Sequence, residues 1–200
     1  MMILRSSPAS PFGRKVKIAA KLLGLWPQIT LVDADTTNPS DSLRQQNPLG
    51  KIPVLVLENG EAIYDSRVIV QYLQDIAGGE ALIPNERAAR FATLRLEALA
   101  DGVQDAALLQ VYEGRFRDPA MQDAKWLQHQ AEKVARALTY LEANVPDEST
   151  HLGNVAVACA LGYLDLRFSG LWRQNHPNLV SWLARFEARV PGFAATRVTA

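Results

Sequence analysis

The spacing of apolar residues changes near residue 80, and this change limits the folds open to the chain. Before that point, short apolar runs of strand length alternate with stretches that have a helical repeat. Beyond it, only the helical repeat continues. A chain of 200 residues, 48% of them hydrophobic, is long enough for two small domains with real cores. We therefore predict an α/β domain over residues 1–79 and an all-helical domain over residues 85–200.

The chain opens with a strand, a helix and a second strand. The segment "MMILRS" is a short apolar run, and "QITLVDA" is another. Between them, residues 11–23 carry apolar side chains at helical spacing, and Gly24 follows where a helix C-terminal cap belongs. Strands joined by a helical crossover must run parallel, so this βαβ unit predicts a parallel pair.

The rest of the first domain predicts a hairpin and a further helix. Residues 33–50 are polar and contain two Asn-Pro breaks, so we expect a loop or a short helix there. In "KIPVLVLENGEAIYDS", two apolar runs flank Asn59-Gly60, and Asn-Gly is the strongest short signal for an antiparallel hairpin. The segment "SRVIVQYLQDIA" then returns to helical spacing. The order of the first domain is therefore βαβ-ββα.

The second domain reads as a helical bundle. Gly78-Gly79 and the Leu82–Pro84 segment resemble a linker, and no strand signal follows them. The segment 154–168 is apolar on nearly all sides, which is typical of a central buried helix. Helical patterns cover residues 86–116, 121–144, 154–168 and 177–188.

Charge and composition exclude several classes of function. Lys plus Arg and Asp plus Glu both number 21, which disfavours nucleic acid or an anionic membrane as the main partner. The single cysteine, Cys159, lies in an apolar run and reads as a core residue. The three histidines are far apart and form no metal-ligand motif, so we expect no metal. Without a signal segment or a membrane span, we expect a cytoplasmic protein.

Ser10-Pro11 stands at the start of the first helix. Serine is a favoured N-cap and proline is favoured at the first helical position, so capping alone explains the pair. A Ser-His-Asp triad is not supported, because the chain has no GxSxG motif and no histidine tied to the serine.

Three strings give the chain a family resemblance over essentially its whole length: "SPFGRKVKIAA", "NPLGKIPVLVLENGEAIYDSRVIVQYL" and "NVAVACALGYLDLR". They resemble the glutathione S-transferase superfamily, in a bacterial, serine-type form with a tau-like first motif. The resemblance implies a thioredoxin-like first domain and an all-helical second domain. In such relatives the serine before Pro-Phe activates the glutathione thiol, and omega-like members have cysteine there. The corresponding residue is Ser10, and Phe12 falls in the same glutathione-binding motif.

The middle string resembles the glutathione-binding block. The resemblance implies a cis peptide bond at Ile52-Pro53, whose Ile52 backbone would pair with the cysteinyl unit of glutathione. It also implies that Asp65 and Ser66 hold the γ-glutamyl end and that Lys51 meets the glycine carboxylate. Without the resemblance, Asp65 and Ser66 read equally well as a helix cap, and Lys51 as an ordinary surface lysine.

The second domain should supply the electrophile pocket, but its residues are less certain. On the long helix, Leu108, Val111 and Tyr112 are candidates, although each also fits core packing. Asp101 and Asp105 lie one turn apart, either on a solvated face or lining a dimer groove that reaches a neighbour's glutathione. Relatives begin the core helix with a Ser/Thr-x-x-Asp capping box, whereas this chain has His151-Leu152-Gly153-Asn154, where Asn154 can still cap alone.

These features predict a glutathione transferase that activates glutathione as a thiolate for attack on a small hydrophobic electrophile. Glutathione would be a co-substrate with no separate cofactor, and we expect a homodimer with a role in detoxification. A glutathione-dependent peroxidase or disulfide-bond reductase would use the same thiolate, and a maleylacetoacetate-isomerase-like role is a lesser alternative. A non-catalytic glutathione- or partner-binding protein is the alternative from another class.

Overall fold

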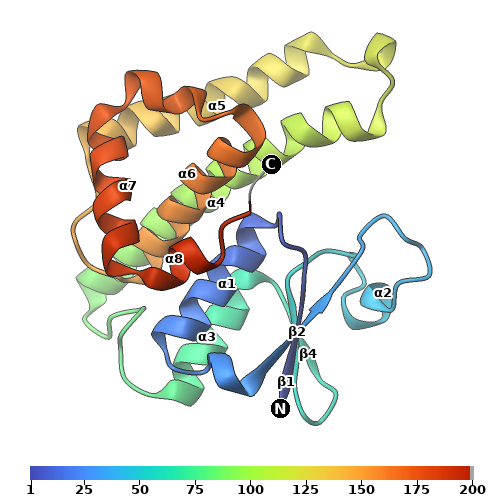
Figure 1. Cartoon of the computed structure of the whole chain (residues 1–200), viewed down its shortest axis with the longest axis vertical. Helices are drawn as coiled ribbons and strands as arrows, with labels where there is room; N and C mark the ends of the chain where they lie inside the picture. Colours follow the sequence, from blue (N-terminus) through green and yellow to red (C-terminus); the bar gives the residue numbers. More distant parts are fainter. Residues whose placement is uncertain (199–200) are drawn as a thin grey trace.

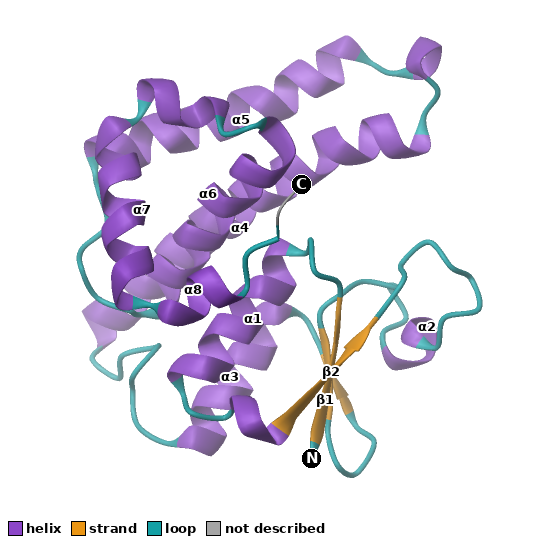
Figure 2. Cartoon of the chain, in the orientation of Figure 1, coloured by secondary structure: helices purple, strands orange, loops and turns teal. Residues whose placement is uncertain are grey.

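The structure is a computed structural model that describes residues 1–198. Its N-terminal half contains one sheet, which Figures 1 and 2 show nearly edge-on. The sheet has four strands in the order β2-β1-β3-β4. The strands β1 and β2 are parallel and β3 and β4 are antiparallel, as predicted, and β3 also pairs antiparallel with β1. The strands are β1 (Met2–Ser6), β2 (Ile29–Asp33), β3 (Val54–Val56) and β4 (Ala62–Ile63).

Two helices, α1 (Pro11–Leu22) and α3 (Ser66–Ala77), lie on the side of the sheet that faces the helical half (Figure 1). Helix α1 is shared between two cores. Its Val16 packs with Leu4 and Leu55 of the sheet, while its Ile18 packs in the core of the helical half. All three of Leu4, Val16 and Ile18 are fully buried. The helix that carries Ser10 at its start is therefore held from both sides.

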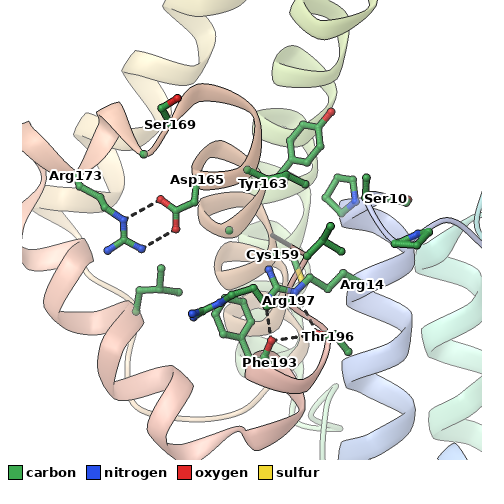
Figure 3. Close-up of a pocket in the computed structure, with 18 residues that line it drawn as sticks. Ser10, Arg14, Cys159, Tyr163, Asp165, Ser169, Arg173, Phe193, Thr196 and Arg197 are labelled. Atoms are coloured by element: carbon green, nitrogen blue, oxygen red, sulfur yellow. Dashed lines mark hydrogen bonds and ion pairs between the residues drawn. The ribbon is translucent and has the colours of Figure 1, made fainter. Parts of the chain in front are cut away.

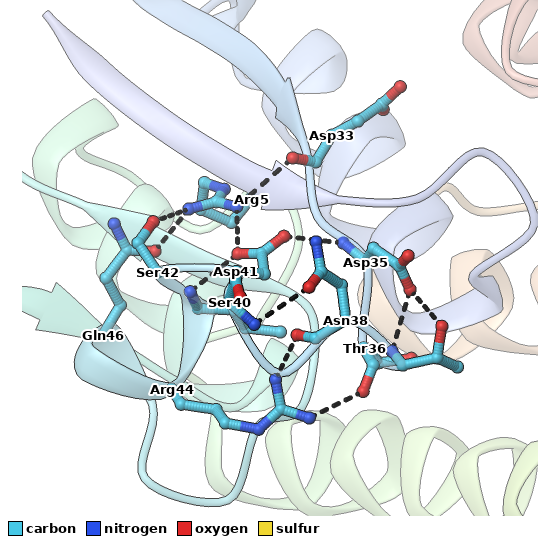
Figure 4. A network of polar contacts seen from close by, with 12 residues as sticks. Arg5, Asp33, Asp35, Thr36, Asn38, Ser40, Asp41, Ser42, Arg44 and Gln46 are labelled. Carbon is cyan, nitrogen blue, oxygen red and sulfur yellow. Dashed lines mark hydrogen bonds and ion pairs between the residues drawn. The ribbon is translucent and has the colours of Figure 1, made fainter.

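A buried arginine helps to hold the segment after β2 to the sheet. Arg5 of β1 is 7% exposed, and its guanidinium donates to Asp41 at 2.7 Å and to Ser42 and Gln46 at 2.9 Å each (Figure 4). The last of these belongs to the short helix α2 (Leu43–Gln46). This network fixes the polar stretch that leads into Lys51 and Ile52.

The C-terminal half is helical, as predicted. Helix α6 is central: its residues from Leu152 to Leu161 are all buried, and it packs against α4, α1 and α7. Cys159 lies in this core and is fully buried, which confirms its reading as a core residue. The helices are α4 (Arg87–Phe116), α5 (Ala124–Ala143), α6 (Leu152–Phe168), α7 (Pro177–Arg189) and α8 (Pro191–Ala195), with 3-10 turns η1 (Trp26–Gln28), η2 (Pro119–Met121) and η3 (Leu171–Asn175).

One element was not predicted, and one local expectation differs from the structure. After α7 ends at Arg189, Pro191 starts the short helix α8, whose Phe193 is 2% exposed. Asn154 does not cap the core helix by itself. His151 is the N-cap, and its Nδ1 accepts the Asn154 backbone N–H at 3.2 Å. The Asn154 side-chain amide instead donates to Asp147 at 2.8 Å, which ties down the preceding loop.

A connection over residues 78–86 joins the two halves. The proposed domain limits, residues 1–79 and 85–200, stay a prediction. Within residues 1–198, no helix is both long and apolar enough to cross a membrane.

Candidate functional site

The sheet topology brings three predicted segments to the same end of the sheet. Strand β1 leaves that end toward Ser10, and the antiparallel strand β3 begins there directly after Ile52 and Pro53. Strand β4, antiparallel to β3, leads back to the same end and is followed by Asp65 and Ser66. The residues that the resemblance assigned to glutathione therefore share one edge of the molecule, although they come from distant parts of the sequence.

Ser10 is the N-cap of α1, which confirms the capping interpretation. Its Oγ accepts the Gly13 backbone N–H at 3.1 Å. This contact uses a lone pair of the hydroxyl, so the hydroxyl hydrogen remains available to a second acceptor. Gly13 is needed at this turn, because a Cβ there would collide with the Ser6 side chain. Phe12, in the same turn, is half-buried.

The Ile52–Pro53 peptide bond is cis, as the resemblance implied. Pro53 is buried and Ile52 is half-buried against Leu43 and Val54. The Lys51 side chain is exposed, and its backbone carbonyl accepts from the Asn47 amide at 2.9 Å. This turn is therefore anchored to the protein while the Lys51 ammonium is left in solvent.

Asp65 and Ser66 stand at the start of α3. The Asp65 carboxylate caps the helix by accepting the Arg67 backbone N–H at 3.0 Å. Ser66 is 2% exposed and is the first residue of the helix. The capping interpretation of Asp65 is thus confirmed, and it leaves the second carboxylate oxygen for another partner.

A buried network of charges ties this helix start to the helical half. Lys15 of α1 is fully buried, and its Nζ donates to Glu97 at 2.8 Å and to both oxygens of Asp101 at 2.9 Å. The Arg67 Nε donates to Asp101 at 2.9 Å. Burial raises the pKa of Glu97 above its usual value, and Lys15 opposes that rise. Asp101 is 1% exposed, so the solvated-face alternative is wrong for this residue.

Asp105, one turn further along α4, is on the surface near the same edge. Partial burial, and then the Asp101 carboxylate, raise its pKa above the usual value, while Arg67 and Lys51 act in the opposite direction. Asp105 therefore lies within electrostatic reach of Lys51 and Asp65 of its own chain. Its proposed reach to a neighbour's glutathione stays a prediction.

A cavity of about 430 Å³ opens beside Ser10 (Figure 3). Of the residues assigned to glutathione, Ser10 is the one that lines it; Phe12, Lys51, Ile52, Pro53, Asp65 and Ser66 do not. The expected pocket residues Leu108, Val111 and Tyr112 do not line it either. Instead, the walls come from α1, α6, α7, η3 and the end of the chain. They include Arg14, Cys159, Gly162, Tyr163, Asp165, Arg173, Phe193, Thr196 and Arg197.

In this cavity α6, and not α4, supplies the wall opposite Ser10, so the assignment of Leu108, Val111 and Tyr112 to an electrophile pocket stays a prediction. Tyr112 instead packs edge-to-face on Phe116, with the ring centroids 5.2 Å apart. The "GYLDLR" end of the core-helix string does indicate that α6 could line a cavity. There, the polar side chains of Tyr163 and Asp165 follow a long apolar run, and both residues line the cavity.

The cavity offers no cysteine nucleophile. Burial raises the pKa of the Cys159 thiol to about 11, so it stays protonated near neutral pH. In the part of the chain that the structure describes, no group of three or more His, Cys, Asp or Glu side chains is arranged to hold a metal ion. The role that the resemblance gives to the Ser10 hydroxyl stays a prediction.

Comparisons with known proteins identify the family of the chain. The family model "Glutathione S-transferase, N-terminal domain" matches residues 4–81. The GST-like protein YibF of Escherichia coli K12 is 35% identical over 201 residues, which cover 98% of each chain. A glutathione transferase family member from Pseudomonas fluorescens Pf-5, solved with bound glutathione, is 41% identical with a TM-score of 0.92, and the match covers 100% of each chain.

A second structure from Pseudomonas fluorescens Pf-5 contains S-(propanoic acid)-glutathione. It is 40% identical with a TM-score of 0.86, and the match covers 98% of this chain and 99% of that one. Because these likenesses in sequence and in fold extend over the whole chain, the protein belongs to the glutathione S-transferase superfamily.

Proposed function

We propose that the protein is a glutathione transferase in which Ser10 stabilises the thiolate of bound glutathione. The observation that carries this proposal is the position of the Ser10 hydroxyl. It caps α1 through a lone pair, keeps its hydrogen free, and stands at the mouth of a cavity. Capping and thiolate stabilisation are compatible, since one oxygen can accept from Gly13 and donate to sulfur at the same time.

The energies of these interactions are sufficient for the task. Lowering the pKa of a thiol by about two units takes about 2.7 kcal/mol of preferential stabilisation of the thiolate. A hydrogen bond donated to a charged acceptor supplies about 1.5–3 kcal/mol, and a helix N-terminus adds about 0.3–1 kcal/mol. The hydrogen bond from Gly13 further polarises the Ser10 hydroxyl and strengthens it as a donor.

The tripeptide would lie along the edge that the sheet topology builds. The Ile52 backbone would pair with the cysteinyl unit as an added strand. The start of α3 would take the γ-glutamyl end, with Ser66 and backbone N–H groups toward its carboxylate and Asp65 toward its ammonium. Lys51 would meet the glycine carboxylate from its exposed position. The two Pseudomonas fluorescens structures support glutathione as the ligand, since they hold glutathione and an S-substituted glutathione.

The electrophile would enter the cavity beside Ser10, whose walls include apolar side chains such as Leu166, Leu183 and Phe193. Glutathione would serve as co-substrate without a further cofactor. A homodimer, a cytoplasmic location and a role in detoxification belong to the same proposal and rest on the family resemblance. No nucleic acid or membrane partner is part of it.

The test is a titration of the bound thiol. The ultraviolet absorbance of the glutathione thiolate is followed against pH in the wild-type complex and in the variants Ser10→Ala and Ser7→Ala. We expect Ser10→Ala to raise the pKa of the bound thiol by about 1–2 units, since it removes one charge-assisted hydrogen bond. Binding of S-methylglutathione, which has no thiol, should change little, and Ser7→Ala should behave like the wild type.

An unchanged thiol pKa in the Ser10→Ala complex would refute the assigned role. Turnover of haloaromatic, peroxide and mixed-disulfide substrates by the wild type then separates a transferase from a peroxidase or a disulfide reductase. A folded protein that does not bind glutathione in calorimetry would favour a non-catalytic partner-binding role.

A further inference from the structure

We propose that Arg14 is the binding site for a carboxylate on the electrophile, so that the protein prefers small anionic electrophiles. This inference rests on the proposed function and names the class of its second substrate. Arg14 follows Ser10 by one helical turn, and its backbone N–H donates to the Ser10 carbonyl at 2.9 Å. Both residues line the same cavity (Figure 3).

The Arg14 guanidinium is buried but is held by neutral groups. The side chain is 8% exposed. Its Nη2 donates to the Phe193 carbonyl at 2.6 Å, and its Nε donates to the Thr196 hydroxyl at 3.2 Å. The guanidinium carbon lies 3.9 Å from the centre of the Phe193 ring. These contacts orient the group without neutralising its charge, and within residues 1–198 Arg14 forms no ion pair.

The third guanidinium nitrogen, Nη1, lies against Gly162 of α6. A Cβ at Gly162 would collide with this nitrogen, so the glycine makes room for it. Gly162 also lines the cavity. In the described part of the chain, Nη1 makes no hydrogen bond, although Nε and Nη2 of the same group each have an acceptor. Nη1 is therefore a donor left for a ligand.

The other two cationic groups in the wall are already neutralised. Arg173 donates to Asp165 at 2.8 and 2.6 Å, and Arg197 donates to Glu187 at 2.5 Å. Among the described residues that line the cavity, Arg14 thus supplies an uncompensated positive charge. Burial of a charge without a counter-ion is costly, and an incoming anion would offset that cost. The direction of the Arg14 pKa, lowered chiefly by its burial, agrees with this cost.

The distance along the helix indicates the size of the ligand. Four residues of α-helix rise about 6 Å, and an arginine side chain leans back toward the N-terminus of its helix. A sulfur held at Ser10 and a carboxylate held at Arg14 would therefore be separated by only a few bonds. The geometry favours a short electrophile with a carboxylic acid near its reactive carbon over a large neutral aromatic compound.

Calorimetry with conjugates tests this inference without depending on turnover. The probes are glutathione and three S-substituted forms, S-carboxymethyl-, S-(2-carboxyethyl)- and S-(3-carboxypropyl)glutathione, each paired with its uncharged carboxamide. We expect the wild type to bind at least one acid about ten- to a hundred-fold more tightly than its amide. Arg14→Gln should lose this preference, and Arg14→Lys should keep part of it.

The matched control is Arg185→Gln, which removes the same charge from an exposed arginine that pairs with Glu148 away from the cavity. This variant should keep the wild-type preference. If the wild type binds glutathione but binds all three acids no better than their amides, the anion site is refuted while the proposed function stands. That comparison needs no variant to fold. If glutathione itself does not bind, both proposals fall.

Discussion

Replacing Lys15 with methionine should destabilise the protein strongly, because it breaks a charge network that is closed to solvent. Lys15 is 0% exposed, and its partners Glu97 and Asp101 are 3% and 1% exposed. After the replacement, Asp101 keeps Arg67, but Glu97 is left without a cation in ion-pair contact among residues 1–198. Removing one partner of a buried ion pair costs about 3–5 kcal/mol. With an unfolding entropy of about 2.1 cal/mol/K per residue, the Tm should fall by about 7–12 °C.

The same reasoning predicts how the loss depends on pH. In the wild type, burial already raises the pKa of Glu97, and Lys15 holds it down. Without Lys15, the pKa of Glu97 rises further, so at neutral pH the folded state must hold an ionised carboxylate in a poor environment. A carboxyl group whose folded pKa is raised gains stability as the pH falls, because protonation removes the buried charge. The difference between wild type and Lys15→Met should therefore be largest near pH 7.5 and shrink toward pH 5.

Scanning calorimetry and urea unfolding at several pH values measure both effects, and two further variants calibrate them. The double variant Lys15→Met/Glu97→Met removes the orphaned charge and should recover most of the loss, leaving about 1–2 kcal/mol or less. Arg185→Gln breaks an ion pair between side chains that are each 52% exposed, and should cost about 1 kcal/mol at most. A loss below about 1 kcal/mol for Lys15→Met, or one that grows on acidification, would contradict the buried-pair reasoning.

Two further predictions concern helix α6. His151 caps it through an unprotonated Nδ1, and burial lowers the pKa of His151. The contribution of this cap to the free energy of unfolding should thus be complete above about pH 6.5 and should decline as the pH falls below that value. His151→Ser, which keeps a cap, should remove this decline in urea midpoints, and a decline of the same size in the variant would contradict the assignment. Gly153→Ala would place a Cβ 2.9 Å from the Thr93 carbonyl oxygen and should cost about 1–3 kcal/mol. Gly102→Ala, where the Cβ meets nothing within 4 Å, should gain about 0.5–1 kcal/mol, so equal effects at the two glycines would be inconsistent with this packing.

Local signals in the sequence were enough for most of the fold. The turn at Asn59-Gly60 and the end of the first helix at Gly24 are set by the backbone preferences of a few neighbouring residues. Gly24 and Gly60 both have a positive φ in the structure, which glycine adopts most easily. The boundaries of the long helices follow from the same kind of local repeat. Helix α8 was missed because proline and glycine after a helix usually mark its end, whereas here Pro191 occupies the first position of a new helix.

The site was predicted less completely because much of it is made by distant contacts. Arg14 and the Phe193 carbonyl are 179 positions apart in the sequence, and no local pattern connects them. Lysine is rarely buried, so nothing at Lys15 itself indicated a partner. Glu97 and Asp101, two acids one turn apart on the buried side of α4, are the sequence signal for a buried cation, and the pairing of Asp101 with Asp105 overlooks it.

The packing of α1 into both cores has a consequence for ligand binding. Because Val16 is embedded in one core and Ile18 in the other, neither half can swing away without extracting an apolar side chain from its core. This arrangement disfavours hinge motion between the two halves. We therefore expect the cavity beside Ser10 to have its shape before a ligand binds, so that binding loses little conformational entropy. Natural variation could then alter the opposite wall of the cavity, built by α6 and the C-terminal residues, without displacing Ser10.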